Sequence, residues 1–181
     1  IDGYKLVLVD SVVKHELVDS PYNKRRESCE RVAKRLGLET LRDADMEMLD
    51  AVKADISAED YMRARFVIGE KERVLGVCDS LNRGDIATVG RLMYETHEGL
   101  SKDYEVSCEE LDFLNDVAKE CGVTGSRIMG GGFGGCTINL VPDEIHDKFI
   151  ETVTAKFNER YGHEPKIYDV IISDGARRLD D

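Results

Sequence analysis

The residues most suited to chemistry in this sequence form a glycine-rich segment. Every position from Gly130 to Gly135 is glycine except Phe133. Because glycine is costly to order, such a run implies backbone angles that other residues avoid, or a backbone that must approach something closely. Successive N–H groups in such a loop can bind phosphate oxygens without a charged side chain. A tight turn with close backbone packing is the simpler alternative, and the sequence leaves both open.

The context of these glycines excludes two common nucleotide-binding loops. The segment satisfies the pattern G-x-G-x-x-G, but a dinucleotide-binding loop opens a helix, whereas this one runs into the strand-like segment 136–141. No Gly-Lys-Ser or Gly-Lys-Thr follows, so the loop is not a Walker A motif either. A loop beside a phosphate or a substrate remains the functional interpretation. Its candidate residues are Gly130, Gly131, Gly132, Gly134 and Gly135.

A second polar cluster follows the first predicted strand, as KHEL from Lys14 and SPYNKRR from Ser20. It spans a strand end and the start of a helix, where polar side chains can face a cleft. Its cations could face a phosphorylated ligand, although a solvated helix face is the favoured explanation of Lys24, Arg25 and Arg26 taken alone. The ring of Tyr22 could lie in the core, or its hydroxyl could face a sugar.

Residue spacing supports no other catalytic or metal site. The four histidines include no i, i+4 pair for a helical metal site, and the five cysteines include no C-x-x-C pair. We therefore expect reduced thiols and no metal ligand. Ser107 with Glu110 predicts a helix cap, and Glu70 with Arg73 predicts a surface ion pair.

Composition excludes several classes of partner. The 181 residues carry 25 Lys and Arg against 37 Asp and Glu, a formal net charge of −12, so nucleic acid and anionic membranes would repel the chain. No apolar run approaches the ~20 residues of a spanning helix, and the first residues do not resemble a signal peptide. We expect a cytoplasmic protein without nucleic-acid or membrane partners. Because Ile1 stands in place of an initiator methionine, we also expect a piece of a longer protein.

Apolar periodicity predicts the elements that position these residues. A strand is expected over 5–10, followed by a helix over 23–36 that ends at Gly37 and a short helix over 45–55. Ser57 is expected to cap a longer helix that carries an apolar stripe and ends near Gly84. Asp85 is expected to cap the helix after it.

The second half changes character at the glycine segment. The expected elements there are a helix opened by a Ser107–Glu110 capping box and ended by Gly122, a strand over 136–141, a helix opened by Pro142, and a strand over 166–173. Several helices arrive without strands between them. This order predicts an α+β domain in which helices cover one face of a small mixed or antiparallel sheet.

Three segments together resemble the C-terminal half of the galactokinase branch of the GHMP kinase superfamily. They are SPYNKRRESCERVAKRLG, HEGLSKDYEVSCEELDFLNDVA and GSRIMGGGFGGCTINLV, at 20–37, 97–118 and 125–141. The resemblance extends over nearly the whole chain. It implies that residues 1–181 are the C-terminal domain of a two-domain sugar kinase whose N-terminal domain is absent from this chain. The implied fold is the ferredoxin-like GHMP kinase C-terminal domain with additional helices.

The resemblance also implies the activity of the whole enzyme. Such kinases transfer the γ-phosphoryl group of ATP to the anomeric hydroxyl of D-galactose, giving galactose 1-phosphate and ADP. ATP and Mg²⁺ are expected to bind mainly to the N-terminal half, which also supplies the catalytic aspartate. The expected partners of this chain are therefore galactose, ATP and its own N-terminal domain. No catalytic residue and no metal ligand are expected here, so the fragment alone is expected to be inactive.

The family's functional residues transfer to few positions. Tyr22 matches a tyrosine that lines the galactose pocket. Lys14 matches a basic position, often arginine, near the catalytic aspartate, although lysine lacks the planar fork of arginine. The glycines from 130 to 135 match a motif beside the phosphate loop and the substrates. Phe66 departs from the family, where histidine is common, and this change is expected to affect packing more than chemistry.

Three alternatives remain at this point. The chain could belong to a galactokinase-like sensor that binds galactose and ATP without catalysis. It could belong to a kinase for another hexose, such as N-acetylgalactosamine. It could also be an autonomous phosphate-binding or interaction module, which would bind its ligand without a second domain.

Overall fold

The computed structural model describes residues 1–13 and 21–175, so Lys14 lies outside the described residues. Within them, four strands form one antiparallel sheet in the order β2-β3-β1-β4. Strand β1 is flanked by β3 and β4, and β2 and β3 form a hairpin. The strands are β1 (Tyr4–Asp10), β2 (Gly125–Met129), β3 (Cys136–Pro142) and β4 (Lys166–Val170).

Two helices cover one face of the sheet, α5 (Glu109–Glu120) and α6 (His146–Tyr161). On α6, Phe149 and Phe157 lie on one face and are buried against the strands together with Leu114 of α5. The strand residues that they meet are Val7, Val9 and Val141. Alternate residues of β1 point to this face, as the two-residue period of a strand requires.

A third helix, α4 (Ile86–Lys102), packs on the opposite face, so the prediction that helices cover one face is wrong. Val89 and Met93 of α4 meet Leu140, whose neighbour Val141 points to the other face. Apolar residues at successive positions of β3 are typical of a strand that is buried on both sides.

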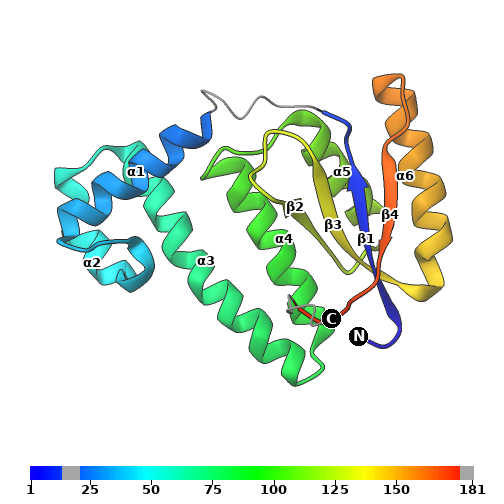
Figure 1. Ribbon diagram of the computed structural model, residues 1–181, viewed down its shortest axis with the longest axis horizontal. Helices are drawn as coiled ribbons and strands as arrows, with labels where there is room; N and C mark the ends of the chain where they lie inside the picture. Colours follow the sequence, from blue (N-terminus) through cyan, green and yellow to red (C-terminus); the bar gives the residue numbers. More distant parts are fainter. Residues whose placement is uncertain (14–20, 176–181) are drawn as a thin grey trace, which may run out of the picture.

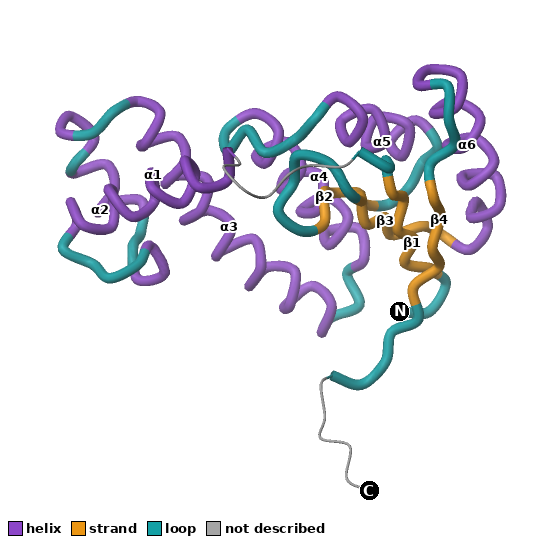
Figure 2. Tube along the Cα trace, turned by 45° about the horizontal axis from the view of Figure 1, so that its top comes forward, coloured by secondary structure: helices purple, strands orange, loops and turns teal. Residues whose placement is uncertain are grey.

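The remaining helices form a lobe beside the sheet, on the side away from α6 (Figures 1 and 2). The helices are α1 (Pro21–Leu36), α2 (Met46–Ala51) and α3 (Ala58–Asn82), with 3₁₀ turns at Leu41–Asp43 and Lys53–Asp55. Their apolar core is separate from the core of the sheet and contains Val32, Ala33, Leu41, Ala44, Leu49, Ala64 and Ile68. The long α3 runs from this lobe back to α4.

Local signals set most helix boundaries as predicted. The hydroxyl of Ser57 accepts the N–H of Asp60 at 3.0 Å, and a carboxylate oxygen of Asp85 accepts the N–H of Thr88 at 3.1 Å. Gly37 follows α1 with φ of 72°, the left-handed value expected after a helix.

Three further sequence-based expectations are wrong, and one strand has no counterpart among the predicted elements. That strand is the segment Gly125–Met129. Helix α5 begins after Cys108 rather than at a Ser107 cap, and β4 ends at Val170. The apolar stripe of α3 is not buried throughout, because Val74 and Leu75 are 59% and 64% exposed. Apolar spacing alone does not say whether a neighbour covers the face.

Among the described helices, none combines the length and the hydropathy that a membrane-spanning helix needs.

Helix α4 approaches β2 through two glycines, and this contact gives a test of the fold. A Cβ atom on Gly90 would overlap the carbonyl oxygen of Thr124. We expect Gly90→Ala to lower the free energy of unfolding by about 1–3 kcal/mol, the usual cost of overpacking, in urea denaturation. Gly69→Ala in α3 is the matched control, because its Cβ would meet only the Arg73 guanidinium at 3.5 Å. It should stabilise by about 0.5–1 kcal/mol. Equal effects would contradict the close approach.

His146 links α6 to β4 and gives a pH-dependent test. Its Nε2 contacts Asp169 at 2.9 Å and its Nδ1 contacts Asp147 at 2.8 Å. The bond to Asp169 raises the pKa of His146 above its ordinary value, burial opposes this, and Asp147 adds to it. Protonated His146 therefore stabilises the folded protein fully at pH values below its unfolded-state pKa of about 6.5. This contribution to the unfolding free energy is lost as the pH rises through the folded-state pKa.

We therefore expect His146→Gln to lose more unfolding free energy at about pH 6 than at about pH 9, because only protonated His146 forms two charged pairs. Urea denaturation at both pH values measures this. Asp169→Asn, which removes the stronger partner, should show the same pH dependence. A loss that does not change with pH would show that the carboxylates do not hold the imidazolium.

Candidate active site

The glycine loop lies at the turn of the β2–β3 hairpin, where β1 also ends (Figure 1). Directly after β1, the N–H and the hydroxyl of Ser11 both donate to the carbonyl oxygen of Gly135 at 2.9 Å. The N–H of Gly135 donates in turn to the Val13 carbonyl at 3.4 Å. One end of the loop is thereby fixed to the central strand of the domain.

The other side of the loop is held by the segment between α4 and α5. The N–H of Phe133 donates to the carbonyl of Val106 at 2.6 Å. A Cβ on Gly132 would overlap that same oxygen, and a Cβ on Gly134 would lie 2.6 Å from the Val13 carbonyl oxygen. Close backbone packing, the simpler alternative from the sequence, therefore explains Gly132 and Gly134.

The remaining glycines have a different environment. A Cβ on Gly130, Gly131 or Gly135 would meet no described atom within 4 Å, and Gly130 and Gly135 have positive φ values of 88° and 77°. Within residues 1–13 and 21–175, the N–H groups of Gly130 and Gly131 have no backbone acceptor outside the strands. Among residues 1–13 and 21–175, nothing covers the outer edge of the loop, and its N–H groups can take the oxygens of a ligand.

Backbone strain gathers at the same place. In the described part of the chain, three non-glycine residues have positive φ: Val12 at 61°, Glu105 at 51° and Phe133 at 61°. A β-branched residue such as Val12 rarely adopts this conformation. Each of the three lies in a segment that contacts the glycine loop or within the loop itself. Because strained residues cluster at functional sites, this observation supports the loop as a candidate site independently of its sequence motif.

The start of α1 adjoins the loop. Tyr22 lies in the first turn and is 47% exposed, so its ring is not part of the core. One turn later, Arg25 is 8% exposed and its guanidinium lies 6.0 Å from the centre of the Phe133 ring. A solvated helix face therefore describes Arg26 but not Arg25. The structure brings the first turn of α1 and the glycine loop to one end of the domain.

A partly buried polar cluster supports the segment that holds the loop. The carboxylate of Asp112 accepts hydrogen bonds from Ser107 at 2.6 Å and Ser101 at 2.9 Å, and it contacts His97 Nε2 at 3.2 Å. Burial acts to raise the pKa of Asp112, but these three contacts outweigh it and lower the pKa to about 2. Ser107 therefore binds a side chain rather than capping α5. Asp112 stays ionised and anchors the segment at any physiological pH.

The thiols near the loop are poor nucleophiles. Burial raises the pKa of Cys108 to about 11. Burial, followed by the charge of Asp10, also raises the pKa of Cys136. Both stay protonated at neutral pH, and a thiol without its thiolate form attacks slowly. Among the described residues, no group of three or more His, Cys, Asp or Glu side chains is placed to hold a metal ion. The site can bind and orient ligands, but the described residues do not form a nucleophile or a metal centre.

The comparisons with known proteins agree with this geometry. Residues 79–159, from the end of α3 to near the end of α6, match the family model described as "GHMP kinases C terminal". These residues carry the fold of the C-terminal domain of GHMP kinases. They include the segment before α5 and the glycine loop, whereas Tyr22 and Arg25 precede the matched region.

Galactokinases are similar to this chain over nearly all of its length. The galactokinase of Clostridium acetobutylicum is 42% identical over 185 residues, covering 98% of this chain and 47% of the relative. Human galactokinase is 42% identical over 175 residues, covering 96% of this chain and 44% of the relative. The chain thus spans about half the length of these curated relatives.

Solved structures give the same picture. The structure of Lactococcus lactis galactokinase complexed with galactose is 31% identical, with a TM-score of 0.87, and covers 98% of this chain and 47% of that one. Leishmania major mevalonate kinase, 18% identical with a TM-score of 0.62, shares the fold. The expected α+β fold of a GHMP kinase C-terminal domain is therefore confirmed.

Sequence reasoning proposed the glycine loop and Tyr22 as site residues but missed the residues that hold the surrounding segments. Arg25, Glu105 and Asp112 act through partners that are distant in the sequence. One signal was available, because Arg25, Glu105 and Asp112 lie within the segments that resemble the family. Phe66 is buried against Tyr104, with ring centres 5.2 Å apart, as expected for a packing residue.

Adjacent glycines of the loop provide a matched test of the site. We expect Gly132→Ala to destabilise the domain by about 1–3 kcal/mol, because its Cβ would overlap Val106 and its φ is 79°. Gly131→Ala should leave the unfolding free energy within about 0.5 kcal/mol, because its Cβ meets open space. Thermal and urea unfolding measure both. Equal destabilisation would contradict the contact between the loop and Val106.

Proposed function

We propose that this chain is the C-terminal part of a galactokinase, which phosphorylates D-galactose with ATP to give galactose 1-phosphate and ADP. One observation carries the proposal. Bacterial and mammalian galactokinases about twice as long are about 40% identical to this chain over 96–99% of its residues. Identity of that extent favours a shared reaction over a shared fold alone.

The geometry suits one side of a phosphoryl-transfer site. Such transfer depends mainly on positioning the two reactants and stabilising charge. The open edge of the glycine loop supplies N–H groups beside the phosphates, and the half-exposed Tyr22 directs its hydroxyl to the sugar. Lys14, outside the described residues, is proposed to lie near the catalytic aspartate of the other domain. Galactose and MgATP are the substrates, with Mg²⁺ and most of the nucleotide bound by that domain.

An apolar region of the surface is consistent with residues 1–181 being one domain of a two-domain protein. Helices α3 and α4 and the sheet line an open pocket of about 470 Å³. Its rim carries exposed apolar residues, including Ile1, Val74 and Leu81. Contiguous apolar surface of this kind is typical of an interface. The second domain is therefore proposed to be the N-terminal half of the kinase. The cytoplasmic location stays a prediction.

The experiment compares the 181-residue chain with a full-length kinase that contains it. We expect galactose-dependent ADP release from the full-length protein only, because the chain alone lacks a nucleophile-activating group and a metal site among its described residues. A coupled ADP assay measures turnover with galactose, with N-acetylgalactosamine and without sugar. Turnover by the chain alone would contradict the proposal. Full-length turnover only with N-acetylgalactosamine would indicate another hexose kinase, and galactose binding without turnover would indicate a sensor.

The sugar side is tested by Tyr22→Phe in the same full-length protein. Loss of one hydroxyl hydrogen bond of about 1 kcal/mol should raise KM for galactose about five-fold, with KM for ATP unchanged. Tyr168→Phe is the matched control, because Tyr168 on β4 is 48% exposed, almost the same as Tyr22. Equal KM values for Tyr22→Phe and the parent would remove Tyr22 from the sugar site.

A further inference from the structure

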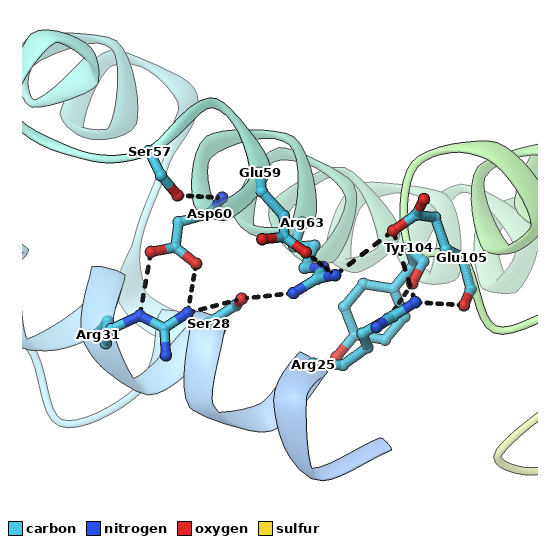
Figure 3. Close-up of polar contacts among 9 residues, drawn as sticks. All are labelled: Arg25, Ser28, Arg31, Ser57, Glu59, Asp60, Arg63, Tyr104 and Glu105. Atoms are coloured by element: carbon cyan, nitrogen blue, oxygen red, sulfur yellow. Dashed lines mark hydrogen bonds and ion pairs between the residues drawn. The ribbon is translucent and has the colours of Figure 1, made fainter. Parts of the chain in front are cut away.

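Arg25 makes contacts that a surface arginine does not make. Its Nε donates to the carbonyl of Tyr104 at 2.7 Å, and its Nη2 donates to the carbonyl of Glu105 at 2.6 Å (Figure 3). The planar guanidinium thus binds two successive carbonyls of a segment about 80 residues away in the sequence. Lysine, a single point donor, cannot reproduce this fork.

The second of these residues, Glu105, needs such support. Its φ of 51° is unfavourable for a residue with a side chain. Its carboxylate lies 3.5 Å from Nη2 of Arg25 and 3.4 Å from Nη2 of Arg63. Arg63 is itself 3% exposed and is held by Ser28 at 2.9 Å and by Glu59. Two buried arginines therefore fix both the backbone and the side chain of a strained residue (Figure 3).

From Glu105 the contacts lead directly into the glycine loop. The next residue, Val106, accepts the N–H of Phe133 and lies against Gly132. Arg25 also reaches the loop from its other side, through its position near the Phe133 ring. Tyr22 precedes Arg25 by one helical turn. Arg25 is therefore the described residue that connects the turn carrying Tyr22 to the loop carrying the open N–H groups.

The energetics favour positioning over stability as the role of this cluster. Taking arginines out of water costs several kcal/mol, and buried ion pairs seldom stabilise more than apolar residues of the same size. What the charges provide is a fixed geometry for carbonyl groups that apolar side chains cannot bind. The site that benefits from that geometry is the adjoining glycine loop.

We propose that Arg25 is a positioning residue, which sets the glycine loop relative to Tyr22 by holding the carbonyls of Tyr104 and Glu105. Its effect on catalysis rests on the proposed galactokinase function. Its effect on the loop does not, and this difference makes the two proposals separable by experiment.

The first experiment uses the 181-residue chain and its ¹H–¹⁵N NMR spectrum. Arg25→Lys should shift the amide signals of the loop glycines and speed amide exchange of Phe133 about ten-fold or more, while signals of α6 and β4 stay in place. The matched control is Arg26→Lys, because Arg26 is the next residue of α1, has a side chain 72% exposed and pairs only with Glu30 among the described residues. It should change neither readout. Unchanged glycine signals in Arg25→Lys would overturn the proposal.

A second variant, Glu105→Gln, tests the same role in case Arg25→Lys does not fold. Glu105→Gln keeps the size of a side chain that is 51% exposed and removes only its charge. It should move the same glycine signals by less, because the bonds from Arg25 to the two carbonyls remain. If Arg25→Lys unfolds and Glu105→Gln leaves the glycine signals unchanged, the positioning role is wrong.

The second experiment measures kinetics of the full-length protein. Arg25→Lys should lower kcat about 10–100-fold, because small misplacement of a binding group has effects of this size. The control Arg26→Lys should leave both kcat and the melting temperature unchanged. A kcat equal to that of the parent, despite shifted loop signals, would overturn the catalytic part. Absence of sugar-dependent turnover in the parent itself would instead reject the proposed function, and the NMR result would stand.

Discussion

The contact between the Val106 carbonyl and the glycine loop is the constraint on which the site depends. The oxygen accepts the N–H of Phe133 and occupies the space where any Cβ at position 132 would lie. Glycine at that position is therefore a requirement of packing. Because the same loop is fixed to β1 through Ser11, this single contact joins the sheet to the segment that precedes α5.

The site lies where two separately packed regions meet. The sheet with α5 and α6 has one apolar core, and the lobe of α1, α2 and α3 has another. Apolar packing in either core does not determine how the loop and the first turn of α1 face each other. Directional contacts of Arg25, Arg63 and Asp112 supply that information, since hydrogen bonds fix angles that apolar contacts leave free. The cost of burying Arg25 and Arg63 is consistent with a functional rather than a stabilising role.

Much of the fold follows from short-range physics that the sequence expresses directly. Ser57 and Asp85 satisfy the free N–H groups of the helices that begin beside them, and Gly37 supplies the left-handed turn after α1. The apolar spacing of α6 matches its buried face. The glycine loop was recognisable because no other composition permits so many positive φ values. These features depend on residues within about one helical turn of each other, so one sequence suffices to predict them.

What the sequence could not determine depends on residues that are distant along the chain. The segment Gly125–Met129 has no clear alternation and is a strand because it pairs with β3. From its sequence neighbours Arg25 is predicted to be a surface charge, but in the structure it is buried and donates to the carbonyls of Tyr104 and Glu105. Ser107 has the pattern of a cap, but its hydroxyl instead donates a hydrogen bond to the carboxylate of Asp112, which also contacts His97. The sequence by itself predicted Tyr22 and the glycine loop as candidate sugar and phosphate residues. Only the tertiary structure decided which buried charges hold them, because a hydrogen bond requires a partner in space and not in sequence.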